Sequence, residues 1–120
     1  KFFNCHFTST STGPTVEAGT NSIFVNCLFT RVSTSNLLLL ADNRVFVRGC
    51  VFLAPSGFNS YAYQIANKYN ATLQDCLFIG TGSGGAIRFS ELETYPLLCN
   101  GHTIVNWDNY RYTFFLVFHF

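Results

Sequence analysis

Ser22-Ile23-Phe24-Val25-Asn26-Cys27-Leu28-Phe29 is the stretch that decides the fold, because the pattern of its last four residues recurs along the chain. Each copy has a turn-tolerant residue, then Cys, any residue and Phe, and the copies occupy residues 4–7, 26–29, 49–52 and 75–78. Residues 101–104 form a weaker fifth copy, with His in the place of Cys and Ile in the place of Phe. Successive copies begin 22, 23, 26 and 26 residues apart. A period in the twenties, with strand-forming residues around it, predicts a solenoid.

The residues around each copy predict two short strands that meet at a bend. Ile23, Val25, Cys27 and Phe29 alternate with their neighbours, which is the period of a β-strand. This alternation places Phe24 on the opposite, outer side. The residue before each Cys is Asn, Asn, Gly and Asp in turn, and these residue types adopt left-handed backbone angles at low cost. A third extended stretch and a turn complete each repeat, so we expect a parallel β-helix.

Stacked coils, roughly 4.8 Å apart, align the equivalent residues of successive repeats. We therefore expect two internal ladders, one of Cys5, Cys27, Cys50 and Cys76 and one of Phe7, Phe29, Phe52, Phe78 and Ile104. A single coil cannot bury its apolar side, so the stack itself forms the core.

The five cysteines are expected to be free thiols, with disulfide pairing as the alternative. Sulfur atoms stacked in register would need their Cβ atoms closer than the coil spacing allows, and a buried Cys behaves as a small hydrophobic residue. Cys99 precedes His102 by three residues, so it falls outside the ladder and belongs to the preceding strand. The sequence has no Cys-x-x-Cys pair, and we expect no zinc site.

The bend-Cys-x-Phe rhythm resembles that of right-handed parallel β-helix proteins of the pectate-lyase-like superfamily, over nearly the whole chain. The Ser83-Gly84-Gly85-Ala86-Ile87 stretch also resembles the Gly-Gly-Ala-Ile element of polymorphic outer-membrane protein repeats. The Phe-x-x-Asn partner motif of those repeats is missing here. The resemblance implies an all-β, right-handed parallel β-helix. It implies no particular activity, because the same coil serves lyases, hydrolases, phage tailspikes and adhesins.

The composition fits a single parallel β-helix domain over residues 1–120, with about five coils. Hydrophobic residues make up 48% of the chain and charged residues 11%, so disorder is not expected. The chain opens within a repeat, and we expect it to be a fragment of a longer solenoid, incomplete at both ends. The net charge is +1, and the scattered Lys and Arg are expected to be isolated, solvated charges, which argues against a nucleic-acid partner. No apolar run is long enough to span a membrane.

The sequence shows no catalytic arrangement, so we expect no enzymatic activity, no cofactor and no bound metal. A lyase or glycosidase of this fold needs clustered carboxylates. Here Asp75 belongs to a bend, Asp42 belongs to a turn and Glu17 stands alone. His102 occupies the inward Cys position and is interpreted as a core residue. The alternative function is a carbohydrate-active β-helix, similar to a polysaccharide lyase or hydrolase, with its catalytic residues outside this segment.

The loops that follow the Phe ladder form the first candidate binding surface, because the repeat should bring them all to one edge. The last of these loops carries Trp107, Asp108, Tyr110 and Arg111. Aromatic faces beside hydrogen-bonding groups bind sugar rings or form hot spots of protein interfaces. The alternative is that these residues pack down as a C-terminal cap.

An outward apolar stripe is the second candidate surface, and its residues are Phe24, Leu28, Phe46, Val51 and Leu77. Apolar residues on an exposed sheet face indicate that a partner covers it, while β-propensity at surface positions is the alternative. The expected partners are other protein chains or the rest of a longer chain, with a glycan as a further alternative.

The predicted function is therefore a non-catalytic structural or binding scaffold, within a larger surface or extracellular protein or assembly. Asn70-Ala71-Thr72 is an N-glycosylation acceptor triplet in a predicted turn. This triplet favours a secreted or cell-surface location.

Overall fold

The computed structural model describes residues 1–65, 71–80, 83–89, 97–101 and 103–105. These residues form fourteen strands and no helix, arranged in three parallel sheets that we call A, B and C. Sheet A contains β1 (Phe2–Phe3), β4 (Ile23–Val25), β7 (Phe46–Arg48), β10 (Ala71–Gln74) and β13 (Leu97–Asn100). Sheet B contains β2 (His6–Phe7), β5 (Leu28–Thr30), β8 (Val51–Leu53), β11 (Leu77–Ile79) and β14 (Thr103–Val105). Sheet C contains β3 (Val16–Ala18), β6 (Leu39–Ala41), β9 (Tyr61–Ile65) and β12 (Gly85–Phe89).

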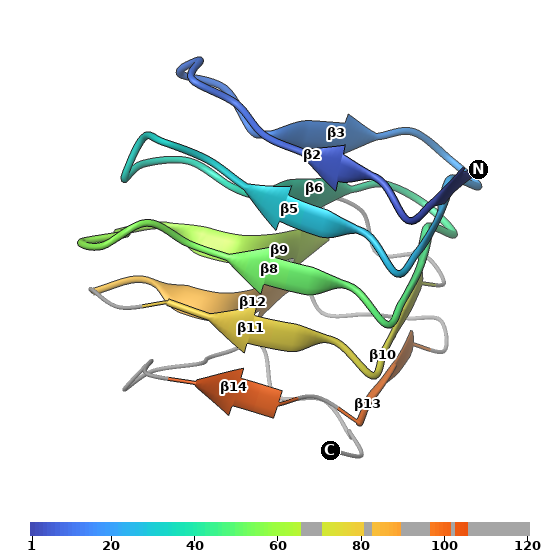
Figure 1. Cartoon of the computed structure of the whole chain (residues 1–120). Coiled ribbons are helices and arrows are strands. Elements are labelled where there is room, and N and C mark those ends of the chain that lie inside the picture. Colours follow the sequence, from blue (N-terminus) through green and yellow to red (C-terminus); the bar gives the residue numbers. More distant parts are fainter. Residues whose placement is uncertain (66–70, 81–82, 90–96, 102, 106–120) are drawn as a thin grey trace.

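The chain winds through the sheets in the order A, B, C, and each strand pairs with the strand three places further along. In Figure 1 the strands of sheet B run to the left in front and those of sheet C run to the right behind, while the chain descends. This is a right-handed coil, so the predicted parallel β-helix is confirmed. The strands β4 to β12 make three full turns, with shorter or partial turns at both ends, so the expectation of about five coils was too high for the described residues.

The bend between sheets A and B is made by the residue before each Cys position. Asn4, Asn26, Gly49, Asp75 and Gly101 all have positive φ, between 53° and 75°. These are the residue types that accept a left-handed backbone without a large steric cost. The bend amides still donate to the next coil, with Asn4 N bonding Val25 O, Asn26 N bonding Arg48 O, Gly49 N bonding Gln74 O and Asp75 N bonding Asn100 O, at 3.0 to 3.1 Å.

Because of the left-handed bend, the side chains of sheet A point to the opposite face from the one predicted. Phe24 is 1% exposed and lies in the core, in register with Val47, whereas Ile23 and Val25 are half-buried on the outer side. The prediction was wrong because it carried one alternation from Ile23 to Phe29 across Asn26. A residue in the left-handed region reverses the phase, so Phe24 and Phe29 both point inward.

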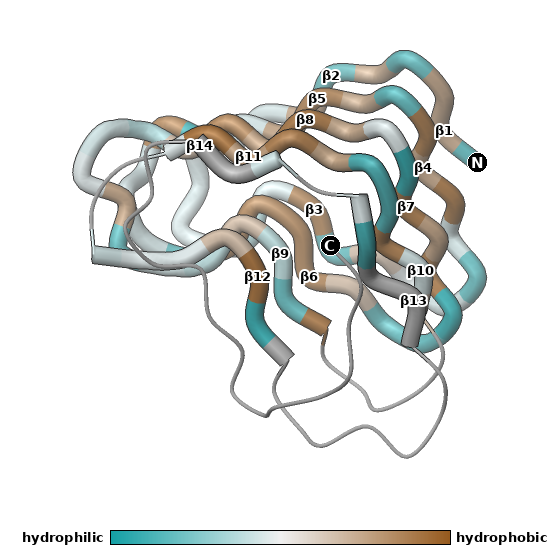
Figure 2. The backbone as a smooth tube through the Cα atoms, turned by 90° about the horizontal axis from the view of Figure 1, so that it is seen from below, coloured by the Kyte–Doolittle hydropathy of each residue, from teal (hydrophilic) through white to brown (hydrophobic). Residues whose placement is uncertain are grey.

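The Phe ladder is confirmed in sheet B. Phe29, Phe52 and Phe78 are fully buried, and their rings stack with centroids 4.8 Å apart and planes 6° apart. Phe7 continues the stack at 5.3 Å from Phe29. In Figure 2, which is viewed along the solenoid, hydrophobic residues follow this side of the coil from β5 to β11. Ile104 lies in register with Phe78, as expected.

The Cys ladder is confirmed as a row of free thiols at Cys5, Cys27, Cys50 and Cys76. Each thiol donates to the carbonyl two residues before it, on Phe3, Val25, Arg48 and Gln74, at 3.2 to 3.5 Å. Burial raises the pKa of Cys27, while a hydrogen bond with Cys76 is the main cause that lowers the pKa of Cys50. Cys99 lies in β13 in register with Leu73, which confirms that it belongs to the strand before the ladder.

The glycine pair of the Ser83–Ile87 stretch has a packing reason. Gly84 N donates to Phe58 O at 3.1 Å and Gly85 N donates to Ser60 O at 3.0 Å. A Cβ on Gly84 would collide with the backbone of Ser60. The coils therefore leave no room for a side chain at Gly84.

Replacing Phe52 with Ala should lower the free energy of unfolding by about 3–5 kcal/mol, because it leaves a cavity between two stacked rings. Leu53→Ala is the matched control, since Leu53 is the next residue and its side chain is 42% exposed. It should cost less than about 1 kcal/mol. Urea titration followed by circular dichroism measures both changes. A Phe52→Ala loss as small as that of the control would contradict the ladder.

Candidate interaction surface

The outer face of sheet B carries two parallel rows of apolar side chains. Leu28, Val51 and Leu77 are in register at the first position of β5, β8 and β11. Leu53 and Ile79 are in register at the third position of β8 and β11. Side chains two residues apart point to the same side of a strand, so these five residues form one surface, which we call the sheet B patch.

The sheet B patch is accessible, and polar residues continue its two rows at three of their four ends, while Val105 is in register at the fourth. Leu53 is 42% exposed and the other four side chains are half-buried. His6, Thr30 and Thr103 occupy the same two rows at their ends. His6 Nε2 and Thr30 Oγ1 are 3.1 Å apart and share a hydrogen bond. An apolar centre with a polar rim is the usual anatomy of a protein interface.

The predicted stripe is only partly assembled by the structure. Leu28, Val51 and Leu77 do share one row, as expected, whereas Phe24 is in the core. Phe46 is half-buried on the outer face of sheet A, on the other side of the bend, in register with Ile23. Whether a partner covers these residues stays a prediction.

Leu53 and Ile79 belong to the same patch, although each directly follows a Phe of the ladder, where the sequence predicted that a loop begins. Leu53 and Ile79 follow Val51 and Leu77, respectively, by two residues on the same strand. Extending each predicted strand by one residue beyond its Phe would have assigned both residues to the outer face of the sheet.

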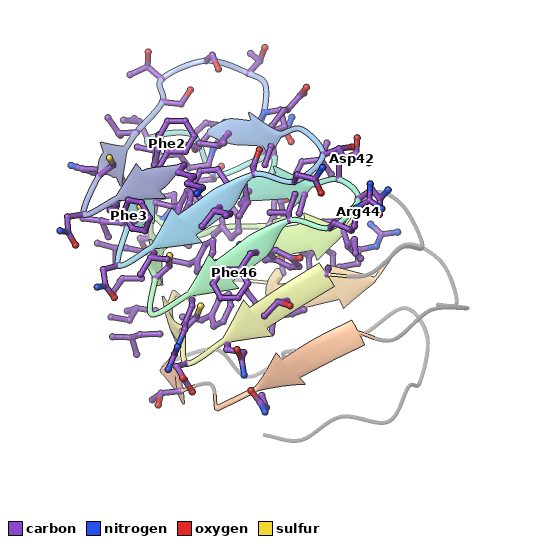
Figure 3. All side chains as sticks on the ribbon, turned by 90° about the vertical axis from the view of Figure 1, so that its right-hand side faces the viewer. Phe2, Phe3, Asp42, Arg44 and Phe46 are labelled. Atoms are coloured by element: carbon purple, nitrogen blue, oxygen red, sulfur yellow. The ribbon has the colours of Figure 1, made fainter. Side chains whose placement is uncertain are left out.

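A second, smaller apolar surface lies on the outer face of sheet A. Phe3 pairs with Val25, and Ile23 pairs with Phe46. Phe3 is 54% exposed. Figure 3, which looks onto this side, places Phe3 near the top of the solenoid and Phe46 lower down.

Further along sheet A this outer face becomes polar. Gln74 donates to the side chain of Asn100 at 3.1 Å, and Arg48 and Asp75 form an exposed ion pair at 3.6 Å. The N-terminal coils thus supply Phe3, Ile23, Val25 and Phe46 to the apolar part of this face.

The loop edge is the side of the solenoid where the chain passes from sheet B to sheet C, and Figure 1 shows these loops gathered at the left. This confirms that the described loops share one edge. The first two loops are joined by Arg31, which is 4% exposed. Its guanidinium donates to four backbone carbonyls, those of Gly13 at 2.8 Å, Leu37 at 2.9 Å, Ser11 at 2.9 Å and Ser33 at 3.2 Å.

The expectation that all Lys and Arg side chains are solvated was wrong for Arg31, which is buried. Its acceptors are neutral, and burial lowers the pKa of Arg31. The guanidinium fork can donate to several carbonyls at once, and here these carbonyls belong to two successive loops. Arg31 therefore holds the loop edge together and does not present a charge to a ligand.

Two shallow hollows lie near the turn between sheets C and A. One, of about 210 Å³, is lined by Glu17, Ala18, Gly19, Leu40 and Asp42. The other, of about 200 Å³, is lined by Arg44, Val45, Phe46, Ala71 and Thr72. Figure 3 shows Asp42 and Arg44 at this turn.

Glu17 was expected to stand alone, and the structure instead places it in the same hollow as Asp42. Asp42 N donates to Ala18 O at 3.1 Å, which holds the two coils together at this point. Nowhere in the described residues do three or more His, Cys, Asp or Glu side chains come together to hold a metal ion.

Several predicted residues lie outside the described residues. They are Asn70, His102, Trp107, Asp108, Tyr110 and Arg111. The loop-edge ligand site of residues 107–111 therefore stays a prediction from the sequence.

No protein-family model, curated protein or solved structure matches this chain. The described part of the chain also contains no helix long and apolar enough to cross a membrane. The resemblance to pectate-lyase-like proteins therefore stays a prediction from the sequence repeat.

Replacing Arg31 with Ala should destabilise the fold by about 2–4 kcal/mol, because four backbone carbonyls, one of them in a buried bond, lose a charged donor at once. Arg48→Ala is the control. Its side chain is 60% exposed in the ion pair with Asp75, and an exposed pair contributes at most about 1 kcal/mol. Thermal and urea unfolding of both variants measures the difference. Equal losses would show that the Arg31 bonds do not hold the loop edge.

Proposed function

We propose that this chain is a non-catalytic scaffold coil of the pectate-lyase-like type, which binds another protein chain through the sheet B patch. The supporting observation is the patch itself, with five apolar residues in two registered rows. The strands beneath it are paired on both sides at β5, β8 and β11. The patch therefore lies on strands that are paired on both sides. The pairing of these strands does not require apolar side chains on the outer face.

The chemistry of the patch favours a flat, apolar partner. Its side chains are aliphatic, and none of the five is charged. Binding would remove Leu53 and its neighbours from water, and each square ångström of apolar area contributes about 25 cal/mol. The polar rim of His6, Thr30 and Thr103 would fix the position of the partner by hydrogen bonds.

A solenoid suits such a role because each coil is stabilised by its neighbours alone. The core ladders and the Arg31 bonds use only inward and loop-edge side chains. The outer face of sheet B is thus free to vary without loss of the fold. We place the chain in a larger surface or extracellular assembly, where scaffolds of this shape present long faces.

Photo-cross-linking tests this proposal. A benzoylphenylalanine at position 53 or 77 should form adducts with a protein partner when the full chain is expressed in its native source. The same probe at Val32, which is 68% exposed on the loop edge, is the control. Leu77→Lys should abolish the adduct at position 53 without changing the unfolding midpoint. Equal adducts at positions 53 and 32, or none at 53, would reject the patch.

A second candidate function is carbohydrate hydrolysis, and one observation favours it. Glu17 and Asp42, from neighbouring coils, line the same hollow. Glycosidases use two carboxylates, one as general acid and one as nucleophile or base. These two residues would take those roles on a polysaccharide lying across sheet C.

A reducing-sugar assay against a panel of soluble polysaccharides tests this second candidate. If it is correct, the chain releases reducing ends, and Glu17→Gln and Asp42→Asn each reduce the rate at least about 100-fold, as loss of an acid or base does. Glu17→Asp should retain part of the activity. Absence of release by the unaltered chain would leave the scaffold as the only function proposed.

A further inference from the structure

Cys50 and Cys76 form a buried pair of free thiols in two successive coils. Cys50 is 1% exposed and Cys76 is 2% exposed. The strands that directly follow them, β8 and β11, are paired in register, and Leu77 N donates to Cys50 O at 2.9 Å. Both thiols have the same orientation, because each donates to the carbonyl two residues before it. The Cys50 thiol also shares a hydrogen bond with the Cys76 thiol. The two sulfur atoms are therefore neighbours, related by a shift of one coil.

The size of this shift is given by the rings two residues further along. Phe52 and Phe78 stack with centroids 4.8 Å apart and planes 6° apart. A disulfide would need the two sulfur atoms about 2 Å apart, much less than one coil. A metal ion midway between two thiolates would need them about 4.6 Å apart, since a metal–thiolate bond is about 2.3 Å long. Small rotations of the two side chains make up the difference, so the spacing suits a linear bridge of sulfur, metal and sulfur.

The surroundings of the pair allow both thiols to lose their protons. Each carbonyl that accepts from one of these thiols also accepts from a bend amide of the preceding coil at 3.0 Å, Arg48 O from Asn26 N and Gln74 O from Gly49 N. Both carbonyls thus keep a donor when the thiols ionise. Cys27 N donates to Cys50 Sγ at 3.4 Å, and a hydrogen bond to the charged form of a group favours that form.

Two thiolates in a line select a particular kind of ion. Zinc takes four ligands in structural sites, and among the described residues no three His, Cys, Asp or Glu side chains come together to hold a metal. Thiolate is a soft ligand that favours Cu(I). The closed-shell Cu(I) ion accepts linear coordination by two sulfur atoms, which is the arrangement that stacked coils offer.

We propose that Cys50 and Cys76 bind one Cu(I) ion, which links two successive coils through a linear S–Cu–S unit. Two S–H bonds break, two Cu–S bonds form, both protons pass to solvent, and no electron is transferred. Gly49 is half-buried and Asp75 is exposed, so the pair lies directly inside the bend, and local opening of the bend admits the ion. The expectation of no bound metal rested on a missing zinc motif and missing carboxylate cluster, neither of which this site needs. The site lies inside the coil, away from the sheet B patch, and goes beyond the proposed function.

X-ray absorption spectroscopy of the purified, reduced chain, loaded with one equivalent of Cu(I) in the absence of oxygen, tests the proposal. The copper should have two sulfur neighbours and no nitrogen or oxygen neighbours. Loading should also raise the unfolding temperature, because the ion binds only the folded pair, whereas Zn(II) should not raise it. Failure to take up Cu(I), a third sulfur neighbour, or an equal effect of Zn(II) would overturn the proposal.

Competition with a Cu(I) chelator measures the affinity of two matched double variants. Replacing Cys50 and Cys76 with Ala should weaken binding at least about 100-fold, since loss of an outer partner of a metal ligand alone costs 10–100-fold. Replacing Cys5 and Cys27 with Ala removes two thiols of the same ladder and keeps the proposed pair, so the affinity should not change. Circular dichroism checks that both variants fold. Equal losses, an unchanged affinity after removal of Cys50 and Cys76, or a disulfide between these two residues in the purified chain would reject the site.

Discussion

The left-handed residue before each Cys position is the constraint on which the rest of this structure depends. It turns the chain from sheet A into sheet B within one residue, with φ near +60° in every coil. At Asn4, Asn26, Gly49 and Asp75 the backbone amide still donates to the next coil, so the turn does not cost these amides their hydrogen bonds. The turn also sets the phase of both strands, which is why Phe24 and Phe29 both reach the core. Without it the Cys and Phe ladders would not lie side by side.

The ladders pack the interior of the solenoid, whereas the outer side chains of sheet B take no part in this packing. Stacked rings and thiols fill the interior beside sheet B, and Arg31 closes the loop edge by binding carbonyls of two successive loops. None of these interactions involves the outer side chains of sheet B. We propose contact with a partner as the reason for the apolar residues there, of which Leu53 is the most exposed.

The sequence predicted the fold well because the fold is periodic. One motif, repeated at 22 to 26 residues, gave the coil, both ladders, the bend residues and the free thiols. The prediction failed at Phe24, because alternation was extended through Asn26, whose backbone conformation reverses it. Burial of Arg31 has no local signal, since its acceptors include carbonyls of residues 11 and 13 in the preceding repeat. The shared hollow of Glu17 and Asp42 likewise arises only when two coils are stacked. Leu53 and Ile79 could have been predicted from the sequence, because they continue the strand alternation of Val51 and Leu77 by two residues.

The stability of two variants at Asp75 tests the central role of the bend most directly. Asp75→Asn and Asp75→Val both remove the charge that pairs with Arg48, and only Val resists a positive φ because it is β-branched. The account predicts that Asp75→Val lowers the free energy of unfolding by about 1–3 kcal/mol more than Asp75→Asn does, as strain at a left-handed residue requires. Urea titration of the two proteins measures the difference. Equal stabilities would show that the left-handed bend does not constrain the coil.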